Sequence, residues 1–289
     1  MGSLKEIFVE KGYSEIVRSL SEFLDKTYLE TETILKQRKV IWKNIPFPKI
    51  RSEENVLKYY KENGNELLRL LREDIYDINL NKDINIISVL NREESGKDVL
   101  DYGSGPGLLA SRLSLNGFNV TCVDPCKKTN EYLRFKSKRD INLKVIDFDD
   151  FKWDNQYDVV VCMEVIEHVN YPGKLLRKLM DAVKDEGHLV LEYPDKWFEP
   201  ENNPEHIAPQ EFREKITKIL DKSGFKRVSF IPAVFKKTKE DPKKINFIRL
   251  IVQDESVYCT TSFKVEDKDK LINALEIAKK NTIEKFGGK

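Results

Sequence analysis

Residues Val99 to Leu109 read V-L-D-Y-G-S-G-P-G-L-L, and this stretch decides the fold. It predicts a short buried strand, then a glycine turn, then the start of a helix. Three glycines at alternate positions allow a sharp turn and a close approach of the backbone to a ligand, because they carry no Cβ atom. The free N–H groups at a helix N-terminus favour polar or anionic ligands. This arrangement is typical of α/β folds that bind nucleotides.

Two details separate this loop from a dinucleotide site. A dinucleotide fingerprint requires G-x-G-x-x-G, and its last position here is Leu108. In addition, Asp101 stands two places before the first glycine. A carboxylate at that position would repel a pyrophosphate but would accept hydrogen bonds from an ammonium. The sequence therefore predicts a ligand that joins a nucleoside to an amino acid.

The motif D-Y-G-S-G-P-G resembles the first motif of class I S-adenosylmethionine-dependent methyltransferases, and later segments match that family in order and spacing from Val99 to Phe230. Alternating apolar runs and helical stripes predict an α/β fold of the same type: a Rossmann-like, seven-stranded, mostly parallel sheet with helices on both faces. We expect a methyltransferase domain over residues 86–262. An N-terminal helical extension precedes it at 1–85, and a C-terminal helix follows at 263–289. The extension either covers the site as a lid or simply packs against the domain.

The expected strands follow the apolar runs along the chain. They are residues 98–101, 119–123, 143–146, 157–162, 188–193, 227–234 and 246–252, and a further strand is expected at 257–265. The expected helices of the domain are 108–116, 126–136, 172–184 and 210–222, and a final helix is expected at 266–285. A polar loop rich in proline, residues 194–210, is long for a compact domain, which favours a functional role.

The cofactor site is predicted at the ends of the first four strands. At the amino-acid end of S-adenosylmethionine we expect Asp101, Gly103, Ser104, Gly105 and Gly107. Asp124 ends the second strand, where a carboxylate suits the ribose hydroxyls, although an aspartate there could instead cap the next helix. The resemblance implies that Asp147 lies near the adenine amino group, that Phe148 lies against the adenine ring, and that Glu164 borders the cofactor.

The segment Glu164-Val165-Ile166-Glu167-His168 has two carboxylates and an imidazole at spacings i, i+3 and i+4, which share one face if a helix starts here. It resembles the metal-binding segment of ubiquinone-pathway O-methyltransferases and of small-RNA 2′-O-methyltransferases, and in the latter a further histidine completes the site. The resemblance suggests His206 as the counterpart of that histidine. The resemblance implies that Glu164, Glu167, His168 and His206 could hold Mg²⁺ or a transition metal. The same string also occurs in relatives without a metal, and the sequence favours that metal-free interpretation.

Catalysis needs little beyond alignment of the acceptor with the methyl group, because the sulfonium donor is already activated. An oxygen or nitrogen acceptor also has to lose a proton, and His168 and His206 lie where they could accept it. Tyr193, at the end of the fifth strand, could orient the acceptor. His188 opens that strand and is expected to be structural.

Composition limits the class of protein without naming the acceptor. The chain has 289 residues, 34% of them charged, and a net charge of +1, so bulk charge predicts neither nucleic-acid nor membrane binding. Four cysteines without a C-x-x-C pair suit a reducing cytoplasm. No run of 18 apolar residues and no signal-peptide core is present. We therefore expect a cytoplasmic enzyme that methylates a small molecule. The alternatives are an RNA methyltransferase and a non-catalytic S-adenosylmethionine-binding protein.

Overall fold

The computed structural model describes residues 4–36, 52–62, 66–76, 79–138, 143–193, 206–230, 233–238, 248–253 and 256–261. The chain divides into two compact units, Met1–Lys237 and Thr238–Lys289, and each is described by itself.

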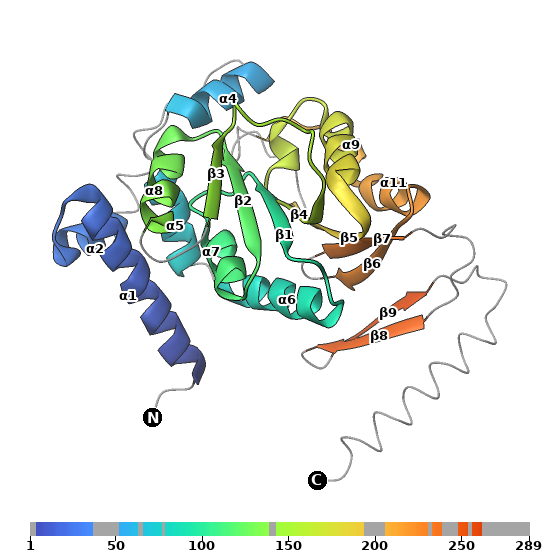
Figure 1. The fold of residues 1–289 in the computed structure, drawn as a ribbon, viewed down its shortest axis with the longest axis horizontal. Helices are drawn as coiled ribbons and strands as arrows, with labels where there is room; N and C mark the ends of the chain where they lie inside the picture. Colours follow the sequence, from blue (N-terminus) through green and yellow to red (C-terminus); the bar gives the residue numbers. More distant parts are fainter. Residues whose placement is uncertain are drawn as a thin grey trace, which may run out of the picture. The chain divides into compact units, whose positions relative to one another are not determined.

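The first unit is built on a seven-stranded sheet with the order β3-β2-β1-β4-β5-β7-β6 (Figure 1). The strands are β1 (Asp98–Tyr102), β2 (Asn119–Asp124), β3 (Leu143–Asp147), β4 (Tyr157–Met163), β5 (Val183–Glu192), β6 (Phe225–Phe230) and β7 (Ala233–Lys237). β7 is antiparallel to both of its neighbours, and the pairs among β1 to β5 are parallel. The predicted Rossmann-like α/β fold is confirmed. The strand order reverses between β1 and β4, and such a switch point opens a crevice at the carboxyl ends of the strands.

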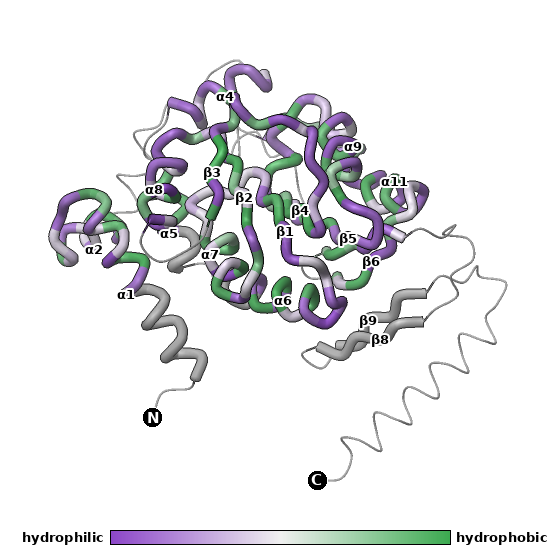
Figure 2. The backbone as a smooth tube through the Cα atoms, in the orientation of Figure 1, coloured by the Kyte–Doolittle hydropathy of each residue, from purple (hydrophilic) through white to green (hydrophobic). Residues whose placement is uncertain are grey.

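Helices cover both faces of this sheet. In chain order they are α6 (Asn79–Arg92), α7 (Leu108–Leu115), α8 (Lys127–Ser137), α9 (Pro172–Ala182), α10 (Gln210–Arg213) and α11 (Ile216–Lys222), with a 3-10 turn η1 (Ile166–His168) before α9. Successive strand side chains point to opposite faces, so the sheet divides the core in two. Leu100 and Val160 pack with α9 and α11, whereas Val99 and Val159 pack with α6, α7 and α8. Figure 2 shows the hydrophobic stretches within the sheet and a mostly hydrophilic α8.

The N-terminal extension contains α1 (Leu4–Leu24), α2 (Tyr28–Lys36), α4 (Glu53–Glu62) and α5 (Glu66–Tyr76). Side chains of α1, α2 and α5 form a third hydrophobic cluster, which includes Leu20, Leu35 and Leu71 and reaches Leu108 and Tyr132 of the sheet domain. This part of the extension therefore packs against α7 and α8. By contrast, α4 lines the large cavity of the unit, as described below.

The C-terminal part differs from the expected strand pattern. The expected strand at 227–234 is two antiparallel strands, β6 and β7, and the sequence places Pro232 between them, a residue that does not continue a central strand. The seventh strand of the sheet is therefore Ala233–Lys237 and not 246–252. β8 (Ile248–Gln253) and β9 (Ser256–Thr261) pair in a separate two-stranded sheet of the second unit. The expected helix at 266–285 and residues 194–205 of the polar loop lie outside the described residues.

Candidate functional site

The glycine loop follows β1 directly, and its backbone requires glycine. Gly103, Gly105 and Gly107 have φ values of 78°, 50° and 66°, in the left-handed region that disfavours residues with a Cβ atom. A Cβ atom on Gly103 would overlap Val165, and one on Gly107 would overlap Leu133. The loop is fixed to the end of β2, because the N–H groups of Gly103 and Ser104 donate to the Val123 carbonyl at 2.8 and 3.2 Å.

Buried carboxyl groups surround the start of this loop. Asp101 is only 4% exposed, and burial raises its pKa to about 7, with the nearby charges of Asp83 and Asp124 adding to the rise. Asp83 lies on α6 and is ion-paired with Arg112. A cationic ligand group would relieve the clustering of negative charge around Asp101. The predicted contact of Asp101 with the amino-acid end of the ligand stays a prediction.

Asp124 joins the glycine loop to the start of α8. Its Oδ2 accepts a hydrogen bond from the Gly105 N–H at 2.9 Å, and its Oδ1 accepts one from the Cys126 N–H at 2.8 Å. The side chain is buried and lines the cavity. Asp124 thus orders the turn before α8, although the N-cap residue of that helix is Cys126 and no side chain caps it. The predicted contact of Asp124 with a ribose stays a prediction.

The residues after β3 occupy different surroundings. Phe148 lines the cavity, whereas Asp147 is not among the lining residues. The Asp147 carboxylate accepts hydrogen bonds from Asn130 Nδ2 at 3.0 Å and from the Arg134 guanidinium at 2.8 Å. These bonds hold the end of β3 against α8, and the predicted contact of Asp147 with adenine stays a prediction.

Aromatic side chains form a wall beside Phe148 that sequence reasoning missed. The ring centroids of Tyr102 and Trp153 lie 4.9 Å apart, those of Phe151 and Trp153 5.0 Å apart, and those of Tyr102 and Phe148 6.1 Å apart. All four side chains line the cavity. The sequence does carry a signal for this wall: Phe148, Phe151 and Trp153 stand within the six positions that follow β3. Such a cluster of aromatic residues could have indicated a surface for a planar group.

A cavity of about 1070 Å³ joins these features at the carboxyl ends of the strands. Of the predicted cofactor residues, it is lined by Asp101, Gly103, Ser104, Gly105, Asp124, Phe148 and Glu164. Gly107 and Asp147 are not among the lining residues. Glu53, Val56, Leu57 and Tyr60 of α4 also line it, so this helix forms one wall. Small-molecule sites usually measure about 300–1,000 Å³, so the cavity has room for a cofactor and a second ligand.

Glu164 follows β4 with a left-handed backbone, φ 52°, which is strained for a residue other than glycine. Its N–H donates to the Glu192 carbonyl at 2.9 Å, and its side chain is exposed to the cavity. Only Ile166–His168 then form a short 3-10 turn. The segment is therefore not the α-helix start on which the shared face of Glu164, Glu167 and His168 depended.

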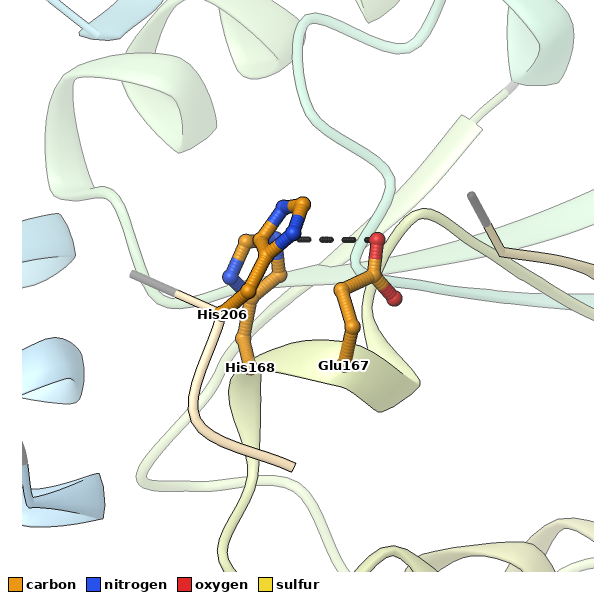
Figure 3. A group of neighbouring side chains, drawn as sticks. All are labelled: Glu167, His168 and His206. Carbon is orange, nitrogen blue, oxygen red and sulfur yellow. Dashed lines mark ion pairs between the residues drawn. The ribbon is translucent and has the colours of Figure 1, made fainter. Parts of the chain in front are cut away.

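Three of the four predicted metal ligands nevertheless come together (Figure 3). One donor atom from each of Glu167, His168 and His206 lies within 4.8 Å of the others. His168 Nε2 is 3.9 Å from Glu167 Oε1, and the two imidazole centroids are 4.9 Å apart. Glu164 is not part of this group.

Glu167 is the buried member of the cluster. Its side chain is fully buried, and neither carboxylate oxygen has a hydrogen-bond partner among the described residues. Burial raises the pKa of Glu167 well above its usual value, and the negative charge of Glu164 adds to the rise. A buried carboxyl without such partners is costly, which makes the group a candidate ligand for a cation.

Backbone hydrogen bonds bring His206 to this cluster. The N–H groups of Ile207 and Ala208 donate to the Glu167 carbonyl at 2.9 and 3.0 Å. The sequence favoured the metal-free interpretation because it could not show that His206 folds back to meet the other residues. The structure shows that His206 meets Glu167 and His168 but not Glu164, and the metal-free interpretation stays a prediction.

Tyr193 and His188 lie apart from the cavity lining. Tyr193 packs against the hydrophobic core, and the Arg213 guanidinium lies 5.6 Å from its ring centroid. His188 is buried in β5, where burial lowers its pKa to about 4. The structural role expected for His188 agrees with this position, and a role for Tyr193 in orienting the acceptor stays a prediction.

The glycine loop after β1, the acidic residue at the end of β2 and the cavity at the switch point together define a class I S-adenosylmethionine-dependent methyltransferase domain. Residues 80–229 match the family model described as a methyltransferase domain. The chain belongs to this family.

Curated relatives match a shorter stretch. The chain is 32% identical over 120 residues to a ubiquinone biosynthesis O-methyltransferase from Rickettsia bellii (strain OSU 85-389), which covers 40% of this chain and 50% of the relative. It is 35% identical over 104 residues to the protein of the same name from Rickettsia akari (strain Hartford), covering 35% of this chain and 41% of the relative. The chain thus spans about half the length of the curated relatives it matches.

Among solved structures, magnesium protoporphyrin IX methyltransferase from Synechocystis PCC 6803 with bound S-adenosylhomocysteine is similar, with 18% identity and a TM-score of 0.49. The match covers 64% of this chain and 97% of that one. Among the helices that the structure describes, none is long and apolar enough to cross a membrane.

Proposed function

We propose that this protein transfers the methyl group of S-adenosylmethionine to a small-molecule acceptor, with a hydroxyl oxygen as the nucleophile. The observation that carries the proposal is a single cavity that joins the glycine loop and Asp101 to His168 and His206, two histidines that lie beside the buried Glu167. The relatives named as O-methyltransferases support an oxygen acceptor.

The cofactor takes its orientation from the polarity of the cavity. The ammonium group lies at Asp101 beside the glycine loop, and Asp124 accepts hydrogen bonds from the ribose hydroxyls. The adenine would lie against Phe148, with Asp147 near its amino group. Gly107 would support the cofactor by keeping the glycine loop in its turn. Glu164 borders the methionine part. His168 and His206, which line the same cavity, would face the acceptor side of the methyl group.

The reaction needs alignment and the removal of one proton. S-adenosylmethionine, when bound, would supply the methyl group: the acceptor oxygen would bond to the methyl carbon, and the electron pair of the broken carbon–sulfur bond would return to sulfur to give S-adenosylhomocysteine. The hydroxyl proton passes to the imidazole of His168 or His206. Tyr60 of α4 holds the His168 ring, since the two ring centroids are 5.5 Å apart in an edge-to-face arrangement.

The cluster also fits a divalent cation, because the buried Glu167 carboxylate has no hydrogen-bond partner among the described residues. Glu167, His168 and His206 would hold it. One carboxylate and two imidazoles suit a transition metal such as Mn²⁺ or Fe²⁺ better than Mg²⁺, which prefers oxygen ligands. When bound, the cation would polarise the acceptor hydroxyl and lower its pKa. A cytoplasmic location, expected from the free cysteines, stays a prediction.

Transfer of labelled methyl from S-adenosylmethionine to a metabolite extract and to RNA tests this proposal. We expect label in the small-molecule fraction and none in RNA. Label in RNA alone would identify the protein as an RNA methyltransferase. Cofactor binding without methyl transfer to the metabolites or to RNA would identify it as a non-catalytic S-adenosylmethionine-binding protein. A parallel reaction in excess chelator separates the two versions of the site, because activity that survives the chelator excludes the metal.

A further inference from the structure

Charge is divided unevenly around the cavity. The lining near the glycine loop contains Asp83, Asp101 and Asp124, and the lysine beside them, Lys82, is ion-paired with Glu192. The lining contributed by α9 is basic, with Lys174 and Lys178. The acidic part matches the ammonium and ribose of the proposed cofactor, whereas nothing in that cofactor's amino-acid and ribose contacts accounts for two lysines on α9.

The lysines belong to one stripe of α9. Tyr171, Lys174, Leu175 and Lys178 all line the cavity, and their spacings of three, four and seven residues place them on one side of the helix. Tyr171 is 63% exposed, so it stands at the open rim, whereas Leu175 is buried. The stripe thus offers an apolar surface and two ammonium groups to the same ligand.

Neither lysine has a carboxylate partner in the part of the chain that the structure describes. Lys174 Nζ lies 4.5 Å from the ring centroid of Tyr171, and Lys178 Nζ lies 5.7 Å from that of Trp153. These cation–π contacts fix the ammonium groups beside aromatic surfaces without neutralising them.

Two carboxylates on the neighbouring walls bond to groups other than these lysines. Glu192 forms an ion pair with Lys82 at 2.7 Å. Glu53 of α4 accepts a hydrogen bond from the Asn170 N–H at 3.0 Å. The positive charge of α9 is therefore left for a ligand.

The helix end adds to this positive potential. α9 has no side-chain N-cap and no acidic residue in its first turn, and that turn instead contains Lys174. The partial positive charge of a helix N-terminus disfavours a cation there, and like charges four residues apart also disfavour the helix. An anion bound at this stripe would offset both effects.

We propose that the methyl acceptor carries an anionic group, a carboxylate or a phosphate, which binds between Lys174 and Lys178 while its apolar part lies on Tyr171, Leu175 and Trp153. This inference rests on the proposed function, since it concerns the acceptor of that reaction. The anion is held away from the reacting oxygen. The lysines therefore determine which acceptors bind, and not how fast the bound acceptor reacts. Neutral analogues of the acceptor bind more weakly because they lack the anionic group that pairs with the lysines.

Calorimetric titration of the S-adenosylhomocysteine-loaded protein tests the anion site with defined probes. Benzoate and phenyl phosphate carry the two anions, benzamide is the neutral probe, and an RNA oligonucleotide of eight residues represents a polymeric phosphate. The test variant is K174Q/K178Q. The matched control is Arg177→Gln, because Arg177 is an exposed cation on the same helix that does not line the cavity.

We expect at least one of the two anions to bind at least about tenfold more tightly than benzamide, and this preference to be lost in K174Q/K178Q and kept in Arg177→Gln. Whichever anion binds more tightly identifies the acceptor group. Equal binding of anions and benzamide, or equal binding in the double variant, would overturn the inference. Lysine-dependent binding of the oligonucleotide alone would also overturn it, in favour of a polynucleotide.

The same titrations on the cofactor-free protein separate this inference from the proposed function. If S-adenosylhomocysteine does not bind, the proposed function fails, and anion binding to the free protein then reports on the lysine stripe alone. If the cofactor binds and the anions do not, only the acceptor inference fails.

Discussion

Affinity for S-adenosylmethionine should depend on pH through Asp101. Burial and the neighbouring charges of Asp83 and Asp124 raise the pKa of this carboxyl to about 7 in the protein without ligand. Only the ionised carboxylate forms a charge-assisted pair with the ammonium of the cofactor. The apparent dissociation constant therefore equals the constant of the ionised form divided by the fraction of protein in which Asp101 is ionised.

The size of the effect follows from this pKa. At pH 6 only about one carboxyl in eleven is ionised, against about ten in eleven at pH 8, so the ionisation of Asp101 alone would raise affinity about tenfold between these values. An α-amino group loses about half of its own protons near pH 8, so the net rise should be about fivefold, and affinity should fall again at higher pH. The predicted profile is a bell whose acid side belongs to Asp101.

Calorimetric titrations at steps of about half a pH unit, from about pH 5.5 to about pH 9, would measure this profile. Asp101→Asn should bind the cofactor more weakly and lose the acid side of the bell. Asp98→Asn is the matched control, because Asp98 starts the same strand and does not line the cofactor cavity. An unchanged acid side in Asp101→Asn would refute the assignment of this residue.

The same group affects folding with a definite sign. Its pKa rises from 3.8 to about 7 on folding, so between these values the folded protein holds a proton that the unfolded chain has released. The free energy of unfolding should therefore fall as pH rises through this window, by up to about 4 kcal/mol, in the absence of ligand. Asp101→Asn should flatten that slope in denaturant titrations.

Three further predictions concern the loop and the cluster. Asp124→Ala leaves the N–H groups of Gly105 and Cys126 without their acceptor and should lower the free energy of unfolding by about 2–6 kcal/mol, besides weakening cofactor binding at least about tenfold; unchanged denaturant and calorimetric titrations would contradict this. Gly107→Ala should lower thermal stability by more than Gly117→Ala, because both backbones are left-handed but only the first Cβ meets a side chain, and equal losses would argue against it. Glu167→Gln should abolish Mn²⁺ binding measured by electron paramagnetic resonance while the fold is kept, and wild-type protein that binds no Mn²⁺ would exclude the metal version.

Local sequence patterns predicted the parts of the site that depend on short stretches of chain. The glycine loop follows from the strand before it and the helix after it, and its left-handed glycines are where the motif placed them. Asp124 could likewise be placed because a carboxylate at the end of β2 faces the loop that follows β1. These positions need only the parallel order of adjacent strands.

The remaining parts depend on contacts between distant segments. His206 reaches His168 because the backbone after it bonds to the Glu167 carbonyl, and no periodicity encodes that contact. The left-handed turn at Glu164 removed this residue from the cluster, which the E-x-x-E-H spacing could not reveal. The sequence left open whether the N-terminal extension covers the site or only packs against the domain, because contacts of α4 such as the ion pair between Lys61 and Asp149 join residues far apart in the chain.

Calorimetric titration of the wild-type protein with S-adenosylmethionine and, separately, with NADH tests the central claim most directly. The buried carboxylate at Asp101 and the absence of the third fingerprint glycine at Leu108 predict binding of one S-adenosylmethionine and no binding of NADH. Binding of NADH with no binding of S-adenosylmethionine would contradict the assignment of the glycine loop and, with it, the proposed methyl transfer.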